Sequence, residues 1–207
     1  MNKITKLLLM LLMSIMTVSV FAEDAVIDGI IYVLDDETSE AFVVMNSDNP
    51  YSGDITIPET VDYNDKTYSV TSIYGNAFSF CLDLTSVTIP NSVKTIGRTA
   101  FYGCLALTSI TIPNSVADIS DSAFGNCPGL ESIVVEDGNP VFDSRDNCNA
   151  IIETETNTLL AGCKSTVIPN SVTTIARAAI AYSSGLTSIV IPNSVTSIGQ
   201  YAFYDCI

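Results

Sequence analysis

Apolar and polar residues alternate in short segments of this chain, and the segments recur at a fixed interval. Residues 107–112 have the sequence Leu-Thr-Ser-Ile-Thr-Ile, which alternates except at the Thr-Ser step. This pattern is typical of a β-strand with one buried face. Pro113 follows at once and ends the strand, because proline has no backbone N–H to donate. The Asn-Ser pair at 114–115 then favours a turn, since both side chains can hydrogen-bond nearby backbone.

The whole unit repeats, and the spacing of its copies predicts the fold. The string Ile-Pro-Asn-Ser-Val occurs at residues 89–93, 112–116, 168–172 and 191–195. Within each neighbouring pair of copies the prolines are 23 residues apart. Divergent copies at Pro58 and at Glu136, which replaces the proline, lie 32 and 33 residues before the next repeat proline, so they contain insertions of nine and ten residues. Six copies in one register are the signature of a solenoid.

One unit cannot bury its apolar residues alone, so successive units must stack. Stacking aligns equivalent positions into apolar rows; two of these are Val61, Val93, Val116, Val172, Val195 and Ile73, Ile96, Ile119, Ile175, Ile198. We therefore predict a mostly β solenoid over residues 55–207, with a ladder of parallel strands and a short 3₁₀ or helical turn closing each 23-residue coil. The insertions are expected near 62–69, as a small hairpin turning at Asn64-Asp65, and at 137–163.

The repeat unit also carries a family resemblance. The pattern Leu-Thr-Ser-Ile-Thr-Ile-Pro-Asn-Ser-Val, followed by Ile, Ala-Phe and Cys, resembles the BspA-type leucine-rich repeat of surface and secreted proteins from host-associated anaerobic bacteria. It covers about residues 55–207. The resemblance implies a leucine-rich-repeat solenoid of the α/β horseshoe class and, for some members, adhesion to host matrix proteins or to other bacteria. It transfers no ligand, because the matching residues are core positions.

The first 22 residues have the pattern of a signal peptide. Lys3 and Lys6 precede an apolar run that begins at Leu7, and Val20 and Ala22 at the two recognition positions favour cleavage after Ala22. The run is too short to span a membrane comfortably. We therefore expect an exported chain, either secreted, periplasmic or on the cell surface, with no membrane span after cleavage.

The two ends of the expected mature chain differ. Residues 23–54 do not fit the repeat; strands at Val26–Leu34 and Ala41–Met45 around a turn-rich segment predict a β-hairpin that caps the first coil. The last coil stops at Ile207, where the next repeat Leu is expected, and no polar cap follows. Either the chain is a truncated member of a longer family, or this end meets a partner or a second copy of the chain.

Charge and composition exclude several functions. The chain has 23 acidic and 8 basic residues, a net charge of −15, which becomes −17 once the two lysines of residues 1–22 are removed. So acidic a surface repels nucleic acid and anionic membranes. The chain has no histidine, so a zinc site and the Ser-His-Asp and Cys-His nucleophiles are not expected. We predict that the protein is not an enzyme.

One acidic cluster raises calcium as an alternative, because it offers many side-chain oxygens. Its members are Glu136, Asp137, Asn139, Asp143, Asp146, Asn147 and Asn149. The cluster lacks the spacing of a known calcium loop, and turns use the same residue types. We predict no metal and no cofactor.

The six cysteines allow two interpretations. Cys81, Cys104 and Cys127 lie 23 residues apart in one repeat position, which Cys206 also occupies. In an exported protein they could form disulfides. We favour a ladder of buried thiols, because the repetition of one position indicates packing. Cys148 and the nearby cysteine at 163 belong to the long insertion and could pair with each other.

The outward face of the strand ladder is the expected partner surface, since leucine-rich repeats engage partners there. Tyrosines on the first insertion are the alternative anchors, because tyrosine is enriched in interface hot spots. The candidate residues are Thr85, Thr88, Thr108, Thr111, Glu131 and Lys164 on the strand face, with Tyr63 and Tyr68 on the insertion.

Two functions remain open from the sequence. The first is an exported module that binds a host or bacterial protein. The second is a structural repeat fragment that has no ligand of its own and self-associates through the uncapped C-terminal coil.

Overall fold

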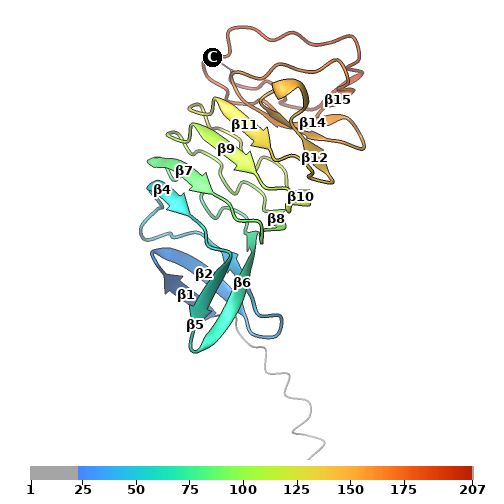
Figure 1. Ribbon diagram of the computed structural model, residues 1–207. Helices are drawn as coiled ribbons and strands as arrows, with labels where there is room; N and C mark the ends of the chain where they lie inside the picture. Colours follow the sequence, from blue (N-terminus) through green and yellow to red (C-terminus); the bar gives the residue numbers. More distant parts are fainter. Residues whose placement is uncertain (1–22, 207) are drawn as a thin grey trace, which may run out of the picture.

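The computed structural model describes residues 23–206, so the signal peptide expected at 1–22 lies outside the described residues. Figure 1 shows coils stacked along one axis, with β1 and β2 at one end and β14 and β15 towards the other. Within the described range the sole helix is the 3₁₀ helix η1 (Arg145–Asn147), and no helix there has the length and apolar character needed to cross a bilayer. The fold is therefore built almost entirely from strands and turns.

The strands are short and follow the repeat. Their bounds are β1 (Glu23–Ile27), β2 (Ile30–Asp35), β3 (Glu40–Val43), β4 (Gly53–Thr56), β5 (Thr60–Tyr63), β6 (Lys66–Ile73), β7 (Leu84–Thr88), β8 (Thr95–Ile96), β9 (Ser109–Ile112), β10 (Asp118–Ile119), β11 (Ser132–Val135), β12 (Phe142–Asp143), β13 (Ala150–Glu153), β14 (Thr158–Gly162), β15 (Thr174–Ile175) and β16 (Ser197–Ile198).

The N-terminal strands differ from the predicted hairpin. The sequence predicts one strand over Val26–Leu34, but the structure divides this segment between the antiparallel strands β1 and β2. The reason is a tight turn at Asp28 and Gly29, whose φ angles are 50° and 84°. Positive φ at both central residues defines a type I′ turn, for which Asp-Gly is a preferred pair. β2 then pairs with β3, and β3 joins β6 in parallel, so these strands continue the sheet of the coils.

One side of the coils forms a parallel sheet. Ile73 of β6 lies opposite Ile96 of β8, which lies opposite Ile119 of β10, so each partner is 23 positions further along the chain. β5 precedes β6 as an antiparallel hairpin, with the predicted turn at Asn64 and Asp65, both at positive φ. The apolar row predicted from the repeat thus forms a row of neighbouring residues in the sheet.

The strands on the other side of the coils form separate two-stranded sheets. β4 pairs with β7, and β9 pairs with β11, both in parallel, with Ser132 opposite Ser109. Residues 163–168, where the repeat predicts a further strand, contain none. Their polar groups bond to the long insertion instead: the Val167 N–H donates to the Cys148 carbonyl at 3.0 Å, and the Thr166 hydroxyl donates to the Asn149 carbonyl at 2.7 Å. The insertion therefore takes the position that a neighbouring strand would occupy.

Aromatic rings tie the first coils together. The rings of Phe78 and Phe101 are stacked with centroids 5.0 Å apart, and those of Phe101 and Phe124 are stacked at 5.3 Å. Phe78 and Phe101 are fully buried. Because each ring packs on a ring of the next coil, the stack couples consecutive coils through their cores.

The core itself has two parts that meet at β13. Ile151 packs in the large cluster that begins at Ala25, whereas its neighbours Ala150 and Ile152 pack in the smaller cluster of the last coils. Successive side chains of a strand point to opposite faces. β13 therefore separates two hydrophobic cores and contributes to both.

We predict that Phe101→Ala lowers the free energy of unfolding by about 3–5 kcal/mol, because the change opens a cavity and removes both ring contacts. Urea denaturation followed by circular dichroism measures this. Phe80→Ala is the matched control, since Phe80 is 59% exposed and its ring meets the Tyr102 ring in a T-shaped contact. A loss for Phe101→Ala no larger than that for Phe80→Ala would contradict the role of the aromatic stack.

Candidate functional site

The four candidate threonines lie on one side of the molecule. Thr85 and Thr88 belong to β7. Thr108 immediately precedes β9 and Thr111 belongs to it, and all four threonines are exposed. They point outward because the apolar residues between them are buried, as in the alternating burial of β9. We call the outward side of β4, β7, β9 and β11, together with residues 163–168 and 186–191, the strand face.

A carboxylate that the sequence did not indicate lies in this face. Asp54 of β4 accepts hydrogen bonds from the Ser86 hydroxyl at 2.6 Å and the Thr85 hydroxyl at 2.7 Å. These bonds hold the pKa of Asp54 below its usual value. The sequence pattern places residue 54 in the cap, because residues 23–54 do not fit the repeat. The signal that could have placed it is Ile57-Pro58, which follows β4 as Ile-Pro follows β7.

Glu131 and Lys164 meet as an ion pair in the middle of the strand face. Lys164 Nζ lies 2.8 Å from Glu131 Oε1. The hydrogen bond and charge of Lys164 lower the pKa of Glu131. The Ser165 hydroxyl also donates to the backbone carbonyl of Glu131, which connects the two coils across the insertion.

Past this ion pair, the strand face becomes apolar. The repeat position held by Thr88 and Thr111 is occupied by valine in the following coils. Val134, Val167 and Val190 are 43%, 69% and 81% exposed. The strand face therefore combines a hydroxyl-rich half containing one carboxylate with a half that exposes three aliphatic side chains.

The two candidate tyrosines of the first insertion lie elsewhere. Tyr63 is half-buried in β5. Tyr68 in β6 is only 4% exposed; its hydroxyl donates to Asp36 Oδ1 at 2.6 Å, and Lys66 Nζ lies 4.9 Å from its ring centroid. A ring so deeply buried offers no surface to a partner. Tyr68 holds the hairpin β5–β6 to the turn between β2 and β3, and we no longer count it among the contact candidates.

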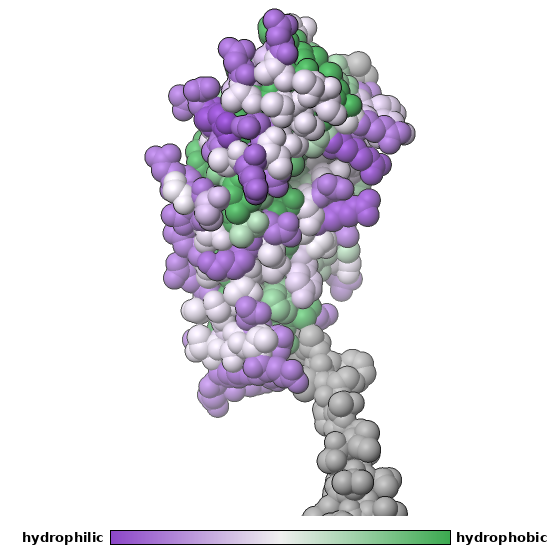
Figure 2. Space-filling view, turned by 90° about the vertical axis from the view of Figure 1, so that its right-hand side faces the viewer, coloured by the Kyte–Doolittle hydropathy of each residue, from purple (hydrophilic) through white to green (hydrophobic). Residues whose placement is uncertain are grey.

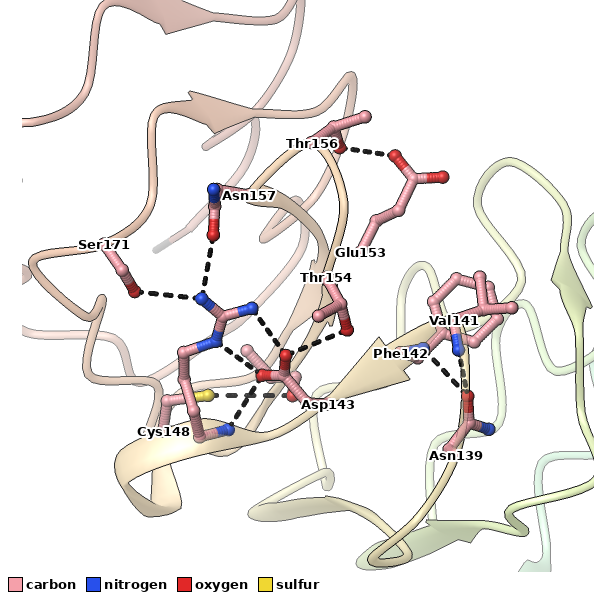
Figure 3. A network of polar contacts seen from close by, with 12 residues as sticks. Asn139, Val141, Phe142, Asp143, Cys148, Glu153, Thr154, Thr156, Asn157 and Ser171 are labelled. Atoms are coloured by element: carbon pink, nitrogen blue, oxygen red, sulfur yellow. Dashed lines mark hydrogen bonds and ion pairs between the residues drawn. The ribbon is translucent and has the colours of Figure 1, made fainter.

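Two members of the acidic cluster, Asp143 and Asn139, use their side-chain oxygens within the chain. Asp143 accepts bonds from the Arg145 guanidinium, with Nε at 2.7 Å, and from the Thr154 hydroxyl at 3.0 Å (Figure 3). These bonds lower the pKa of Asp143 against the opposing effect of its burial. The side-chain oxygen Oδ1 of Asn139 accepts from the backbone N–H of Val141 and Phe142 (Figure 3). Among residues 23–206 no group of three or more Cys, Asp or Glu side chains is arranged to hold a metal ion.

The cysteines of the repeat position make one recurring contact. Three of the four thiols donate to the carbonyl 26 residues earlier: Cys104 to Phe78 at 3.1 Å, Cys127 to Phe101 at 3.0 Å, and Cys206 to Ile180 at 3.0 Å. All six cysteines, which lie within the described residues, are free thiols. The repeated thiol thus links neighbouring coils in the way that the thiol-ladder interpretation requires.

The parallel pairing at a 23-residue offset, together with the near absence of helix in residues 23–206, is that of a mostly β repeat protein built from stacked coils. Residues 156–207 match the family model described as a BspA type leucine rich repeat region (6 copies). The resemblance of the chain to BspA-type leucine-rich-repeat proteins is thereby confirmed.

Solved structures agree with this class. The chain is similar to a leucine rich cell surface protein from Faecalibacterium prausnitzii A2-165, with 20% identity, 87% of this chain and 73% of that chain covered, and a TM-score of 0.51. It is also similar to the pneumococcal vaccine antigen PcpA, with 16% identity, 90% and 68% of the two chains covered, and a TM-score of 0.51. At these identities the likeness shows the fold alone. The comparison with curated proteins gives no significant match.

We predict that native protein at pH 8 reacts with iodoacetamide first at Cys206, because this is the one thiol that is not buried. Burial raises the pKa of Cys148 to about 11, so little of its reactive thiolate exists at pH 8. The neighbouring Cys127 thiol and burial likewise raise the pKa of Cys104. Peptide mass mapping before and after unfolding in urea measures the order. Fast native labelling of Cys104 or Cys148 would contradict the buried ladder.

Proposed function

We propose that the chain is an exported leucine-rich-repeat module that binds a protein partner through the strand face and catalyses no reaction. The observation that carries the proposal is the row of Val134, Val167 and Val190, exposed at 43%, 69% and 81% beside the Glu131–Lys164 ion pair. Exposed aliphatic side chains next to polar ones are the composition of a protein interface, with an apolar centre and a polar rim.

The chemistry of the strand face favours a protein over other partners. Its outward residues include threonines, serines, valines, the Asp54 carboxylate and one ion pair, with no aromatic ring on which a sugar could stack. The net charge of −15 disfavours nucleic acid and anionic lipid. The absence of histidine from the sequence removes the usual general base.

The remaining sequence predictions belong to the same proposal. Residues 1–22 act as the signal peptide, residues 23–54 cap the first coil, and residues 55–207 form a solenoid of 23-residue coils. The match to the BspA-type repeat family supports an address outside the cytoplasm. Adhesion to a host matrix protein or to a bacterial surface protein is the activity that this combination favours.

We predict saturable binding of the purified protein to at least one member of a panel of immobilised extracellular-matrix proteins and bacterial cells. Thr88→Lys, Thr111→Lys and Val167→Lys should each weaken it by about tenfold or more, because a lysine in the face must be desolvated on docking. Biolayer interferometry measures the affinity. Thr60→Lys is the matched control, since Thr60 is exposed on β5, away from the strand face.

Two results would count against the proposal. Equal loss of binding in the Thr60 control would show that added positive charge acts without regard to place. No binding to any panel member by protein with a cooperative unfolding transition would remove adhesion as the function.

Self-association is the second candidate, and exposed core positions in the last coil favour it. Ile191 and Ile198 are 42% and 50% exposed, whereas their counterparts Ile112 and Ile96 are fully buried. Figure 2 shows hydrophobic surface gathered near the upper end of the molecule, which is the end of the last coils. A second copy stacked on this coil would cover these side chains.

We predict that Ile198→Lys shifts any concentration-dependent dimer towards monomer by about tenfold or more in the dissociation constant, because a charge would be buried between the copies. Sedimentation velocity measures the shift at protein concentrations of about 1–100 μM, on the order of the dissociation constants of transient dimers. Thr60→Lys again serves as the control. A monomer throughout this range for the unaltered protein would exclude self-association as the function.

A further inference from the structure

One closing turn is missing from the stack of turns that completes the coils. In a regular coil Leu107, the first residue of the next unit, lies eleven positions after Ile96, the repeat isoleucine. The corresponding residues in the long insertion are Leu159, which pairs with the repeat isoleucine of the following coil, and Cys163, which lies six residues before a repeat proline as Leu107 does. Only four positions separate these two, so β14 takes a direct path where the other coils make a turn.

The closing turns are normally joined by backbone hydrogen bonds. Alternate N–H groups of one turn donate to carbonyls of the next. In the first coils the bonds run from Thr99 to Asp121 at 3.3 Å, from Phe101 to Ala123 at 2.7 Å and from Gly103 to Gly125 at 3.0 Å. The last two coils repeat the arrangement, from Ala178 to Gln200 at 3.1 Å, from Ile180 to Ala202 at 2.8 Å and from Tyr182 to Tyr204 at 2.7 Å.

This ladder is interrupted where the turn is missing. The equivalent donors of the next turn are the N–H groups of Ser122, Phe124 and Asn126, and none of them has a hydrogen-bond partner within residues 23–206. On the opposite side, the carbonyls of Arg177 and Ala181 accept no bond within the same range. Between them only the Ala179 carbonyl is engaged, by the Gly162 N–H at 2.8 Å. Unpaired backbone groups of both kinds therefore border one gap in the ladder.

The gap opens as a pocket. A narrow inner hollow of about 40 Å³ lies among residues 119–127, 160–162 and 176–183. It continues into an open pocket of about 470 Å³. Asp121, Ser122, Arg177, Ala178 and Ala181 line both parts, and we call the whole the open slot. Ligand pockets typically measure about 300–1,000 Å³.

Tyrosines and arginines surround the outer part of the open slot. Tyr102 contacts Tyr182 with centroids 6.2 Å apart, and Tyr204 contacts both Tyr182 and Tyr201 at 5.4 and 5.6 Å. Burial raises the pKa of the Tyr102 hydroxyl, so the ring stays neutral. Four rings thus form an aromatic rim that extends across the gap.

The charges at the rim are unusual for this chain. Arg98 and Arg177 line the open slot, and the Arg177 guanidinium lies 5.9 Å from the Tyr201 ring centroid. Neither arginine forms an ion pair with a residue of the described range, although the chain has 23 acidic residues. Asp121 is the one carboxylate in the lining. The local charge is therefore positive on a strongly acidic protein.

We propose that the open slot binds an extended acidic peptide segment of a partner protein. The peptide backbone adds to the interrupted ladder: its carbonyls accept from the N–H groups of Ser122 and Phe124, and its N–H groups donate to the carbonyls of Arg177 and Ala181. Carboxylates of the peptide contact Arg98 and the Arg177 side chain. This inference rests on the proposed protein-binding function and assigns it a second surface, on the closing turns.

The backbone geometry favours a peptide over a charged saccharide. A saccharide would use the tyrosine faces and the arginines but would leave the donor and acceptor rows unmatched. An extended peptide offers both kinds of backbone group at the spacing of a strand, which is how strands add to open edges. Burying an unpaired backbone group is costly, so the occupant that satisfies both rows is preferred.

The test uses fluorescence anisotropy of a fluorescein-labelled octapeptide of alternating glutamate and valine, capped at both ends, with the purified protein. We expect saturable binding that Arg98→Glu and Arg177→Glu each weaken about tenfold or more, because they place like charges opposite each other. Lys94→Glu is the matched control: Lys94 is exposed, lies outside the open slot and makes the same change in net charge. Asp121→Asn should tighten binding, since it removes the single opposing carboxylate.

Backbone pairing is tested separately. Two further peptides carry N-methyl groups on all valines or on all glutamates. Alternate N–H groups of an extended chain point to opposite sides, so one methylated peptide should lose binding about fivefold or more and the other should retain it.

Several outcomes would overturn the inference. These are no binding of the acidic peptide, equal affinity for an alternating lysine–valine peptide, equal effects of the Lys94 and Arg variants, or no difference between the methylated peptides. Displacement of the peptide by oligogalacturonate, together with insensitivity to methylation, would assign the slot to anionic saccharides instead. Absent peptide binding combined with panel binding that Thr88→Lys still weakens would overturn this inference and leave the proposed function intact.

Discussion

Contact between consecutive coils is the constraint on which the rest of this structure depends. A single coil has one phenylalanine, a few aliphatic residues and one thiol to bury, which is too little for a core of its own. Phe78, Phe101 and Phe124 exclude water from one another, and the thiols of Cys104 and Cys127 bond to the coil before them. The apolar positions are thus restricted by their neighbours above and below, and the outward positions are left free to vary.

In the long insertion, contact between the flanking coils is maintained without a regular coil. β13 sends Ile151 into one core and Ile152 into the other, so the stack continues through the insertion without a regular coil. The polar interior of the insertion is satisfied by its own bonds, among them those of Asp143 with Arg145 (Figure 3). The two cores remain joined at β13, but the ladder of closing turns is interrupted, because Leu159 and Cys163 are too close in sequence to make the turn.

The two candidate surfaces therefore arise in opposite ways. The strand face results from regular repetition, which places one outward side chain per coil in a row and changes threonine to valine along it. The open slot results from the one interruption, which leaves Ser122 and Phe124 with unpaired N–H groups and brings Arg98 near Arg177. Regular repeats can present only side chains to a partner, whereas an interruption also presents backbone.

The sequence by itself determined the repeat, its 23-residue offset, the buried rows and the hairpin turn at Asn64-Asp65, because periodicity and turn chemistry are local properties. It also placed Thr88 and Thr111 outward, since alternation decides which face a strand residue occupies. Only the tertiary structure decided that Asp54 joins the strand face, that Tyr68 is buried, and that Tyr102 meets Tyr182. Each of these three arrangements depends on how an irregular segment packs against the coils. That packing is set by many long-range contacts, which no local sequence pattern encodes.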